Sequence, residues 1–197
     1  MRVVAGDLRG RRLIAPVGHV TRPTTDQTRE AVFNSLGSMD VVRDARVLDL
    51  FAGSGALGVE ALSRGAAHVT FVERDRAALA VIKQNLNALR LVDRATVVPQ
   101  DALFWLRDRR DSAPFDVAFV DPPYDFGEWP EILERLRSAL VVAEAGRPFV
   151  AGVGWQVTKA KRYGRAHIAF LEPVDGTSTD PAGDGEQTRP DTVHPLP

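Results

Sequence analysis

The sequence predicts an α/β fold, in which a mostly parallel sheet of seven strands carries helices on both faces. From residue 46 onward, short apolar segments alternate with longer segments whose apolar residues recur every three or four positions. This is the pattern of parallel strands joined by crossover helices. The first of these strands runs into the turn Gly53-x-Gly55-x-x-Gly58, directly ahead of a helical pattern. Such a turn either holds a nucleotide-like ligand or packs a helix closely on a strand.

A small extension is expected ahead of the sheet. Two extended runs, Arg2 to Ala5 and Arg12 to Ala15, flank a turn rich in glycine and arginine, which predicts a β-hairpin with a basic tip. Thr24 and Gln27 have the spacing of a capping box, and Gly37 can end the apolar helical stripe that follows them. We therefore expect one helix between the hairpin and the sheet.

The sheet domain is expected to span residues 41–172, between an extension of residues 1–40 and a tail of residues 173–197. Its strands are predicted near residues 46–50, 68–73, 95–99, 115–120, 139–144, 156–163 and 166–171. Its helices are predicted near residues 55–64, 75–90, 101–109 and 128–138. The last two strands flank Tyr163-Gly164-Arg165, which predicts an antiparallel hairpin at the edge of the sheet.

Composition limits the possible classes of protein. The 197 residues are 44% hydrophobic and include no cysteine, which predicts one main core and excludes disulfides and thiolate nucleophiles. The four histidines are too scattered to suggest a metal site. No segment is apolar enough to span a membrane, and no signal-peptide pattern begins the chain, so we expect a cytoplasmic protein.

Charge is distributed unevenly along the chain. Residues 172–197 contain six acidic residues and one arginine, so they carry −5, and the rest of the chain carries +4 within a total of −1. This tail is also rich in proline and glycine, and we expect it to be disordered. Residues 1–30 contain six arginines and three acidic residues. Such a positive patch favours a polyanionic partner, although solvated arginines are equally common.

Acidic residues stand near the carboxyl ends of four predicted strands, where sheets of this kind bind ligands. In chain order they are Asp49, Glu73, Asp101 and Asp121. Glu73 could instead begin a helix, and Asp101 could cap one. Asp49 discriminates between ligands, because a carboxylate beside the glycine turn would repel the pyrophosphate of a nicotinamide dinucleotide but attract the ammonium and sulfonium groups of S-adenosylmethionine (SAM).

The fourth predicted strand ends in Asp121-Pro122-Pro123-Tyr124. Because proline has no N–H, this loop offers carbonyl oxygens beside a carboxylate and an aromatic ring. Such a set of acceptors suits the exocyclic amino group of a planar base, with Asp121 and the carbonyl of Pro122 as acceptors and Tyr124 stacked on the ring. The alternative is a structural Pro-Pro loop with a surface tyrosine, which is less favoured opposite a glycine turn.

Several segments together resemble a known family. LDLFAGSGALG, EALSRGA, FVERDRAA and DPPY resemble class I SAM-dependent methyltransferases of amino groups. RVVAGDLRGRRL and RPTTDQTREAVFNSL further resemble the bacterial 16S rRNA guanine-N2 methyltransferases of the RsmD family. The resemblance implies a Rossmann-like class I methyltransferase fold and the conversion of SAM to S-adenosylhomocysteine (SAH). It also implies 16S rRNA or a small-subunit assembly intermediate as the substrate, a monomer, and no metal.

The resemblance assigns roles to individual residues. The expected cofactor contacts are Asp49, Phe51, Ala52, Gly53, Ser54, Gly55, Glu73, Arg74, Asp101 and Ala102. Asp49 and the turn backbone would hold the methionine end, Glu73 the ribose and Asp101 the adenine amino group. The catalytic residues would be Asp121, Pro122, Pro123 and Tyr124. The expected RNA contacts are Arg9, Arg11, Arg12, Arg22, Thr24 and Arg29, and the hairpin arginines among them would bind phosphates. Arg22, Thr24 and Arg29 could instead close over the cofactor.

Two other classes of function remain open. An adenine-N6 DNA methyltransferase uses the same acceptors but commonly carries a separate target-recognition region, and no insertion of that size is present. A nicotinamide-dependent oxidoreductase, or a nucleotide-binding module without activity, would leave the loop from Asp121 to Tyr124 without a purpose. Affinity for SAH and none for NADH separates a methyltransferase of either kind from a nicotinamide-dependent protein.

Overall fold

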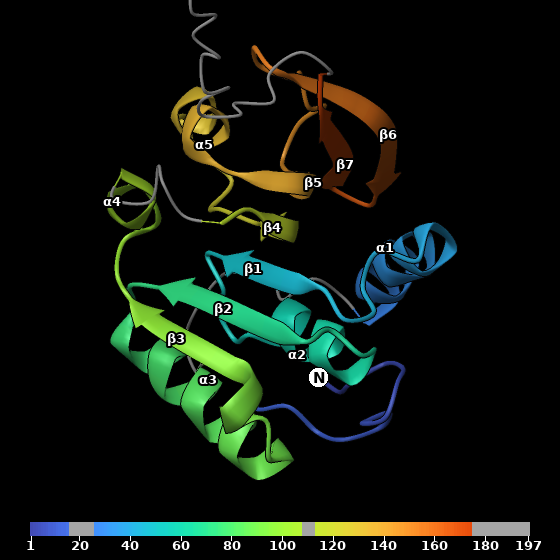
Figure 1. The fold of residues 1–197 in the computed structure, drawn as a ribbon, viewed down its shortest axis with the longest axis vertical. Helices are drawn as coiled ribbons and strands as arrows, with labels where there is room; N and C mark the ends of the chain where they lie inside the picture. The colour runs from blue at the N-terminus through green and yellow to red at the C-terminus, as the bar shows by residue number, and fades with distance from the viewer. Residues whose placement is uncertain (16–25, 108–112, 175–197) are drawn as a thin grey trace, which may run out of the picture.

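The computed structural model describes residues 1–15, 26–107 and 113–174. Its sheet has seven strands in the order β3-β2-β1-β4-β5-β7-β6 (Figure 1). The strands are β1 Arg46–Leu50, β2 His68–Glu73, β3 Ala95–Pro99, β4 Phe115–Val120, β5 Ser138–Ala145, β6 Trp155–Tyr163 and β7 Ala166–Pro173. β1 to β5 are parallel, and β7 is antiparallel to both of its neighbours. The predicted sheet and its edge hairpin are confirmed.

Helices cover both faces of the sheet (Figure 1). They are α1 Asp26–Met39, α2 Ala56–Ser63, α3 Arg76–Leu89, α4 Ala102–Arg107 and α5 Trp129–Arg135, with a 3-10 turn, η1, at Val92–Arg94. α1, α2 and α3 pack on one face and α4 and α5 on the other, so strand residues alternate between two cores. Val47 of β1, for example, faces the first core and Leu48 the second. Among the described residues, no helix has the length and apolar content to cross a membrane.

The sequence of α3 illustrates how these helices form. Leu79, Ile82, Leu86 and Leu89 are spaced three or four residues apart and make one buried stripe against the sheet. Asp75 precedes the helix, and its carboxylate accepts a hydrogen bond of 2.8 Å from the N–H of Ala78. This cap satisfies a donor that the helix itself cannot, so local chemistry sets the start of α3.

The sequence predicted that α1 ends at Gly37, but the helix continues to Met39. The helix ends instead at Asp40, whose φ of 52° lies in the left-handed region. The N–H of Asp40 donates to Gly37 and that of Val41 to Leu36, which is the pattern of a Schellman motif. Asp40 thus takes the position that glycine usually fills. Thr24, the expected cap of this helix, lies outside the described residues.

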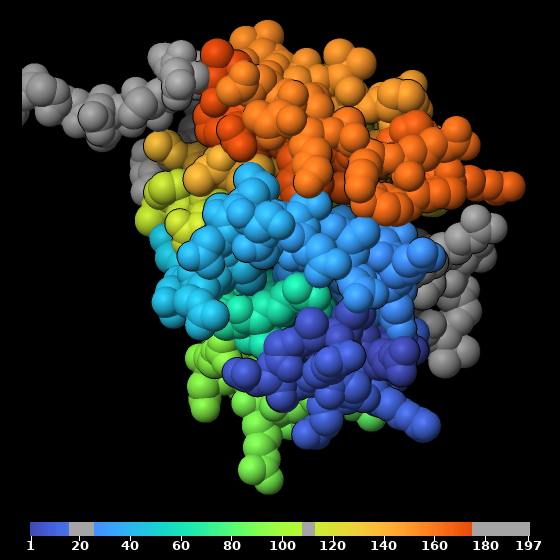
Figure 2. All heavy atoms as spheres, turned by 90° about the vertical axis from the view of Figure 1, so that its right-hand side faces the viewer, coloured from blue at the N-terminus to red at the C-terminus, as the bar shows by residue number. Residues whose placement is uncertain are grey.

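The N-terminal segment, residues 1–15, is packed into the sheet domain. Val3 and Leu13 are buried in the same core as α1, α2 and α3. The two expected strands are reduced to one antiparallel bridge between Arg2 and Arg12. A Cβ atom on Gly6 would lie 1.9 Å from the carbonyl oxygen of Ser63, so only glycine permits the close approach of this segment to α2. Figure 2 shows the segment beside α1, which in turn adjoins the hairpin of β6 and β7.

Candidate active site

The carboxyl ends of the parallel strands form the edge of the sheet where folds of this type bind ligands. The strand order changes direction beside β1, which lies between β2 and β4. Leu50, the last residue of β1, is in register with the last residue of β4 and the last but one of β2. Phe51, Glu73 and Asp121 therefore reach this edge at the same level, so the structure brings together three of the predicted site residues.

The three glycines of the turn after β1 have different structural roles. Gly53 and Gly55 have φ values of 54° and 75°, which favour glycine. A Cβ on Gly55 would lie 3.3 Å from the ring of Phe71, and one on Gly58 only 2.3 Å from it. On Gly53, the nearest atom would be a carbonyl oxygen 3.9 Å away. Gly55 and Gly58 thus allow α2 to pack on the sheet, whereas a Cβ on Gly53 would meet its nearest neighbour at an ordinary van der Waals distance.

Glu73 fixes the glycine turn at the end of β2. Its Oε2 accepts a hydrogen bond of 2.8 Å from the N–H of Gly53, and its Oε1 accepts from the N–H groups of Arg74 and Asp75. Asp75, and not Glu73, caps the following helix. A carboxylate offers about four acceptor positions, so these three bonds leave room for a further donor.

Asp101 caps α4 and also forms an ion pair. Its Oδ1 accepts hydrogen bonds from the N–H groups of Leu103 and Phe104, at 3.0 and 3.3 Å. Its Oδ2 lies 3.1 Å from a guanidinium nitrogen of the exposed residue Arg74. Ala102 begins the helix and is buried. The alternative role of Asp101, as a helix cap, is therefore true of its Oδ1. Its Oδ2 pairs with Arg74 and so links the loop after β3 to the loop after β2.

Asp49 lies beneath the glycine turn and is only 2% exposed. Its Oδ2 accepts a hydrogen bond of 2.9 Å from the N–H of Gly58, in the first turn of α2. Burial is the main reason that the pKa of Asp49 is raised from 3.8 to about 7; the bond from Gly58 opposes this shift, and the negative charge of Glu73 adds to it. Asp49 thus supports α2, which has no side-chain cap of its own at Gly55.

The raised pKa of Asp49 predicts a pH-dependent effect of the Asp49→Asn substitution. Between pH 4 and pH 7 Asp49 in the folded protein holds a proton that the same residue has lost in the unfolded chain, so the contribution of Asp49 to the free energy of unfolding falls as the pH rises through this range. Asparagine keeps the acceptor without the charge. In urea titrations, the variant should be more stable than the wild type at pH 8 and equally stable near pH 4.

The exposed control Asp93→Asn should stay within about 0.5 kcal/mol of the wild type at both pH values. A difference for Asp49→Asn that does not vary with pH would contradict the assignment.

The loop from Asp121 to Tyr124 follows β4 directly. The carbonyl of Pro123 accepts a hydrogen bond of 2.9 Å from the N–H of Phe126. The Tyr124 side chain is 59% exposed. A Cβ on Gly146, just after β5, would lie 2.6 Å from the Tyr124 ring. The ring therefore rests against a glycine that the sequence analysis did not single out.

A row of aromatic rings links the glycine turn to this loop. Phe51, which has a φ of 65°, packs edge-on against Phe126 with ring centres 5.3 Å apart. Phe126 contacts Trp129 at 5.9 Å, and Trp129 contacts Phe149 at 4.8 Å. Edge-on pairs of this kind add stability beyond the area that they bury. No pattern in the sequence predicts this row, because its members come from three separate parts of the chain: Phe51, then Phe126 with Trp129, then Phe149.

The residues expected to contact RNA are placed differently from one another. Arg9, Arg11 and Arg12 are exposed on the N-terminal segment. Arg29 is fully buried, and its guanidinium lies 2.8 Å from the carboxylate of Asp26 and 3.6 Å from that of Glu60. The prediction that Arg29 contacts RNA is therefore wrong, because this side chain serves an internal ion pair. Arg22 and Thr24 lie outside the described residues.

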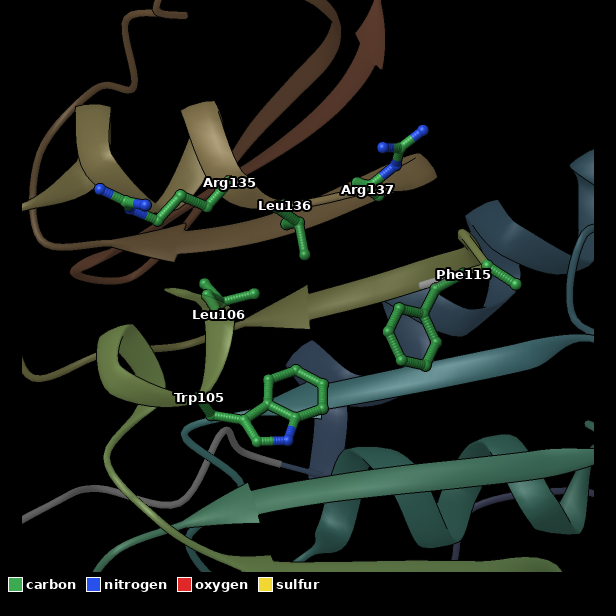
Figure 3. Close-up of a pocket in the computed structure, with 7 residues that line it drawn as sticks. Trp105, Leu106, Phe115, Arg135, Leu136 and Arg137 are labelled. Carbon is green, nitrogen blue, oxygen red and sulfur yellow. The ribbon is translucent and has the colours of Figure 1, made fainter. Parts of the chain in front are cut away.

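A hollow between α4 and α5 is separate from these residues (Figure 3). Its lining includes Trp105 and Leu106 of α4 and Leu136, which follows α5. Phe115 also lines it and is the first residue of β4. Asp121 follows the opposite end of the same strand, so this hollow plays no part in the candidate site.

A family model described as Conserved hypothetical protein 95 matches residues 1–172. The chain belongs to this family. Ribosomal RNA small subunit methyltransferase D of Escherichia coli strain K12 is 39% identical over 190 residues, which cover 90% of this chain and 93% of that protein. The protein of the same name from Haemophilus influenzae is 36% identical over 174 residues, which cover 83% of this chain and 89% of that protein.

Solved structures show the same architecture. Escherichia coli yhhF superimposes with a TM-score of 0.76 at 36% identity, over 88% of this chain and 97% of that protein. A hypothetical protein of Thermus thermophilus superimposes with a TM-score of 0.73 at 29% identity, over 87% of this chain and 99% of that protein. The comparisons confirm the predicted family, the predicted fold class and the predicted class of enzyme, a methyltransferase.

Proposed function

We propose that this methyltransferase transfers the methyl group of SAM to the exocyclic N2 amine of a guanine in 16S rRNA, acting as a monomer on the RNA or on an assembling small subunit. The observation that carries the proposal is the placement of Asp121-Pro122-Pro123-Tyr124 at the sheet edge that also holds the glycine turn. The names of the Escherichia coli and Haemophilus influenzae relatives support small-subunit rRNA as the substrate.

The residues of the glycine turn fit SAM. Gly53 has no side chain and a positive φ, so the backbone of the turn can approach a ligand closely. Glu73 has acceptor capacity for a ribose hydroxyl beyond its three bonds to N–H groups. Asp49 carries a negative charge beneath the turn when it is ionised, which favours an ammonium group over a pyrophosphate. When bound, SAM supplies an electrophilic methyl carbon on a cationic sulfur.

The Asp121 loop supplies what a weak nucleophile needs. The lone pair of the guanine N2 is delocalised into the ring, so the amine must be held in line with the methyl group. The carboxylate of Asp121 and the carbonyl of Pro122 would accept its two N–H groups and draw positive charge away as the N–C bond forms. The bond between the methyl carbon and the sulfur would break as the N–C bond forms, which leaves neutral SAH. One of the two amine protons would then pass to water, so no strong base is required beforehand. Tyr124 replaces the stacking that the base loses when it leaves its helix, and positioning carries most of the rate.

Two measurements test the proposal directly. Calorimetry should show binding of SAH and none of NADH, and the opposite result would establish a nicotinamide enzyme instead. Labelled SAM should transfer its methyl group to 16S rRNA, with N2-methylguanosine in the digested product. Label in N6-methyladenine of duplex DNA would support the alternative methyltransferase. Mapping the methyl group that is missing from the rRNA of a deletion strain would identify the nucleotide.

The exposed arginines of the N-terminal segment lead to a prediction about salt dependence. Each phosphate contact contributes about 0.7 to 0.9 to the slope of log affinity against log salt concentration. Replacing Arg9, Arg11 and Arg12 together with glutamine should therefore reduce this slope by up to about 2 to 3 in RNA-binding titrations. The matched triple variant at Lys161, Arg162 and Arg165 removes the same charge from the hairpin of β6 and β7. If only that variant flattens the slope, the RNA lies on the hairpin and not on the N-terminal segment.

A further inference from the structure

Asn85 is a buried polar residue of α3 that joins two distant parts of the chain. Its side chain is 2% exposed and sits one helical turn after Ile82. Its Oδ1 accepts a hydrogen bond of 2.9 Å from the N–H of Ile14, and its Nδ2 donates to the carbonyl of the same residue at 3.0 Å. Nδ2 also lies 3.2 Å from the carbonyl oxygen of Ser54. One amide thus holds both the N-terminal segment and the glycine turn.

The N-terminal segment is also held by α2, the helix that starts from the same turn. The carboxylate of Glu60 accepts hydrogen bonds from the N–H groups of Val4 and Ala5. The hydroxyl of Ser63 donates to the carbonyl of Ala5 at 2.6 Å and accepts from the N–H of Leu8 at 3.0 Å. The segment is therefore tied to both helices that flank the glycine turn. A change in the turn would alter the geometry of its partners in the segment.

The two parts that Asn85 joins have different proposed ligands. Ser54 lies between Gly53 and Gly55 in the turn expected to approach SAM. Ile14 lies two residues after Arg12, in the segment whose exposed arginines are expected to contact RNA phosphates. On the basis of the proposed function, we infer that Asn85 is a positioning residue that couples cofactor binding to RNA binding. Each ligand then strengthens the binding of the other through this amide.

The physical basis is a shared hydrogen-bonding partner. Residues in one hydrogen-bond network do not contribute independently, because each bond depends on the position of the common group. A buried amide without its partners is costly, so Asn85 favours arrangements that satisfy the turn and the segment together. Coupling of this kind is reciprocal: the factor by which SAH raises RNA affinity equals the factor by which RNA raises SAH affinity.

The test measures that factor with SAH and an in vitro transcript of 16S rRNA. In the wild type, SAH should strengthen RNA binding about fivefold or more, and the transcript should strengthen SAH binding equally. In Asn85→Ala both ratios should fall to about one. Asn85→Asp keeps the acceptor for Ile14 but lacks both donors, and it should lose the coupling as well. The matched control is Asn87→Ala, because Asn87 is exposed on the same helix and its side chain donates to the carbonyl of Lys83 within that helix. It should keep the wild-type ratio.

The outcomes separate this inference from the proposed function. If the wild type does not bind SAH, the proposed function fails. If it binds SAH and RNA independently, or if Asn85→Ala keeps the wild-type ratio, the coupling role of Asn85 is wrong and the proposed function stands. Hydrogen exchange in the wild type decides the case even if the Asn85 variants do not fold. SAH should slow amide exchange in residues 1–15, and unchanged exchange in a protein saturated with SAH would overturn the inference.

Discussion

Replacing Asp121 with alanine should lower the rate constant of methyl transfer about 10²- to 10³-fold and leave the affinity for SAH unchanged. In the proposed site the carboxylate accepts an N–H of the target amine and stabilises the charge that develops on it. The expected cofactor contacts lie on other elements, at the glycine turn after β1 and at the ends of β2 and β3. Single-turnover kinetics at saturating SAM would measure the rate constant, and calorimetry the affinity for SAH.

Asp125 provides a matched control for Asp121. It is an exposed aspartate in the same loop, so Asp125→Ala removes the same charge without removing the proposed acceptor. Its rate constant should stay close to that of the wild type. If Asp121→Ala weakens SAH binding as much as it slows methyl transfer, Asp121 belongs to the cofactor site and the proposed division of the site is wrong.

The elements of the sheet could be predicted because their signals are local. β2 occupies the predicted residues 68–73, and α3 begins and ends one residue inside the prediction. In both elements one or two faces are buried, and the spacing of apolar residues that are close in sequence shows which faces these are. The acidic residues at the strand ends could be located for the same reason.

The functions of individual side chains could not be predicted where they depend on distant partners. The sequence left open whether the glycine turn binds a ligand or packs a helix on a strand, and only the structure shows Gly58 against Phe71 and Gly55 against Phe71 and Ile82. Arg29 was expected to meet RNA, but the buried carboxylate of Glu60 lies beside it. A single sequence contains no record of either contact. That Arg29 and Glu60 are buried as an ion pair can be seen only in the folded structure, which brings the two side chains together.

Glu60 should make one of the largest contributions to stability in the chain. Its side chain is almost completely buried, and its carboxylate is the common acceptor for the backbone of Val4 and Ala5 and for the side chains of Arg29 and Arg64. Glu60→Ala would leave a buried guanidinium without this counterion and two N–H groups without their acceptor. Such losses destabilise proteins by about 3 to 5 kcal/mol, a large part of the total stability of a domain. Urea titrations at pH 7 would measure the difference.

The contacts of Glu60 with Val4 and Ala5 indicate that the N-terminal segment is part of the folded domain. Because Val3 and Leu13 are in the core and Glu60 binds the backbone between them, we expect deletion of residues 1–16 to be at least as destabilising as Glu60→Ala. Deletion would therefore confuse loss of the fold with loss of RNA binding. Glu30→Ala, which removes an exposed carboxylate from α1, should cost no more than about 0.5 kcal/mol. Glu60→Gln keeps one acceptor oxygen, so its cost should fall between these two. If Glu60→Ala costs no more than Glu30→Ala, the contacts of Glu60 with Arg29 and with the N-terminal segment do not stabilise the fold.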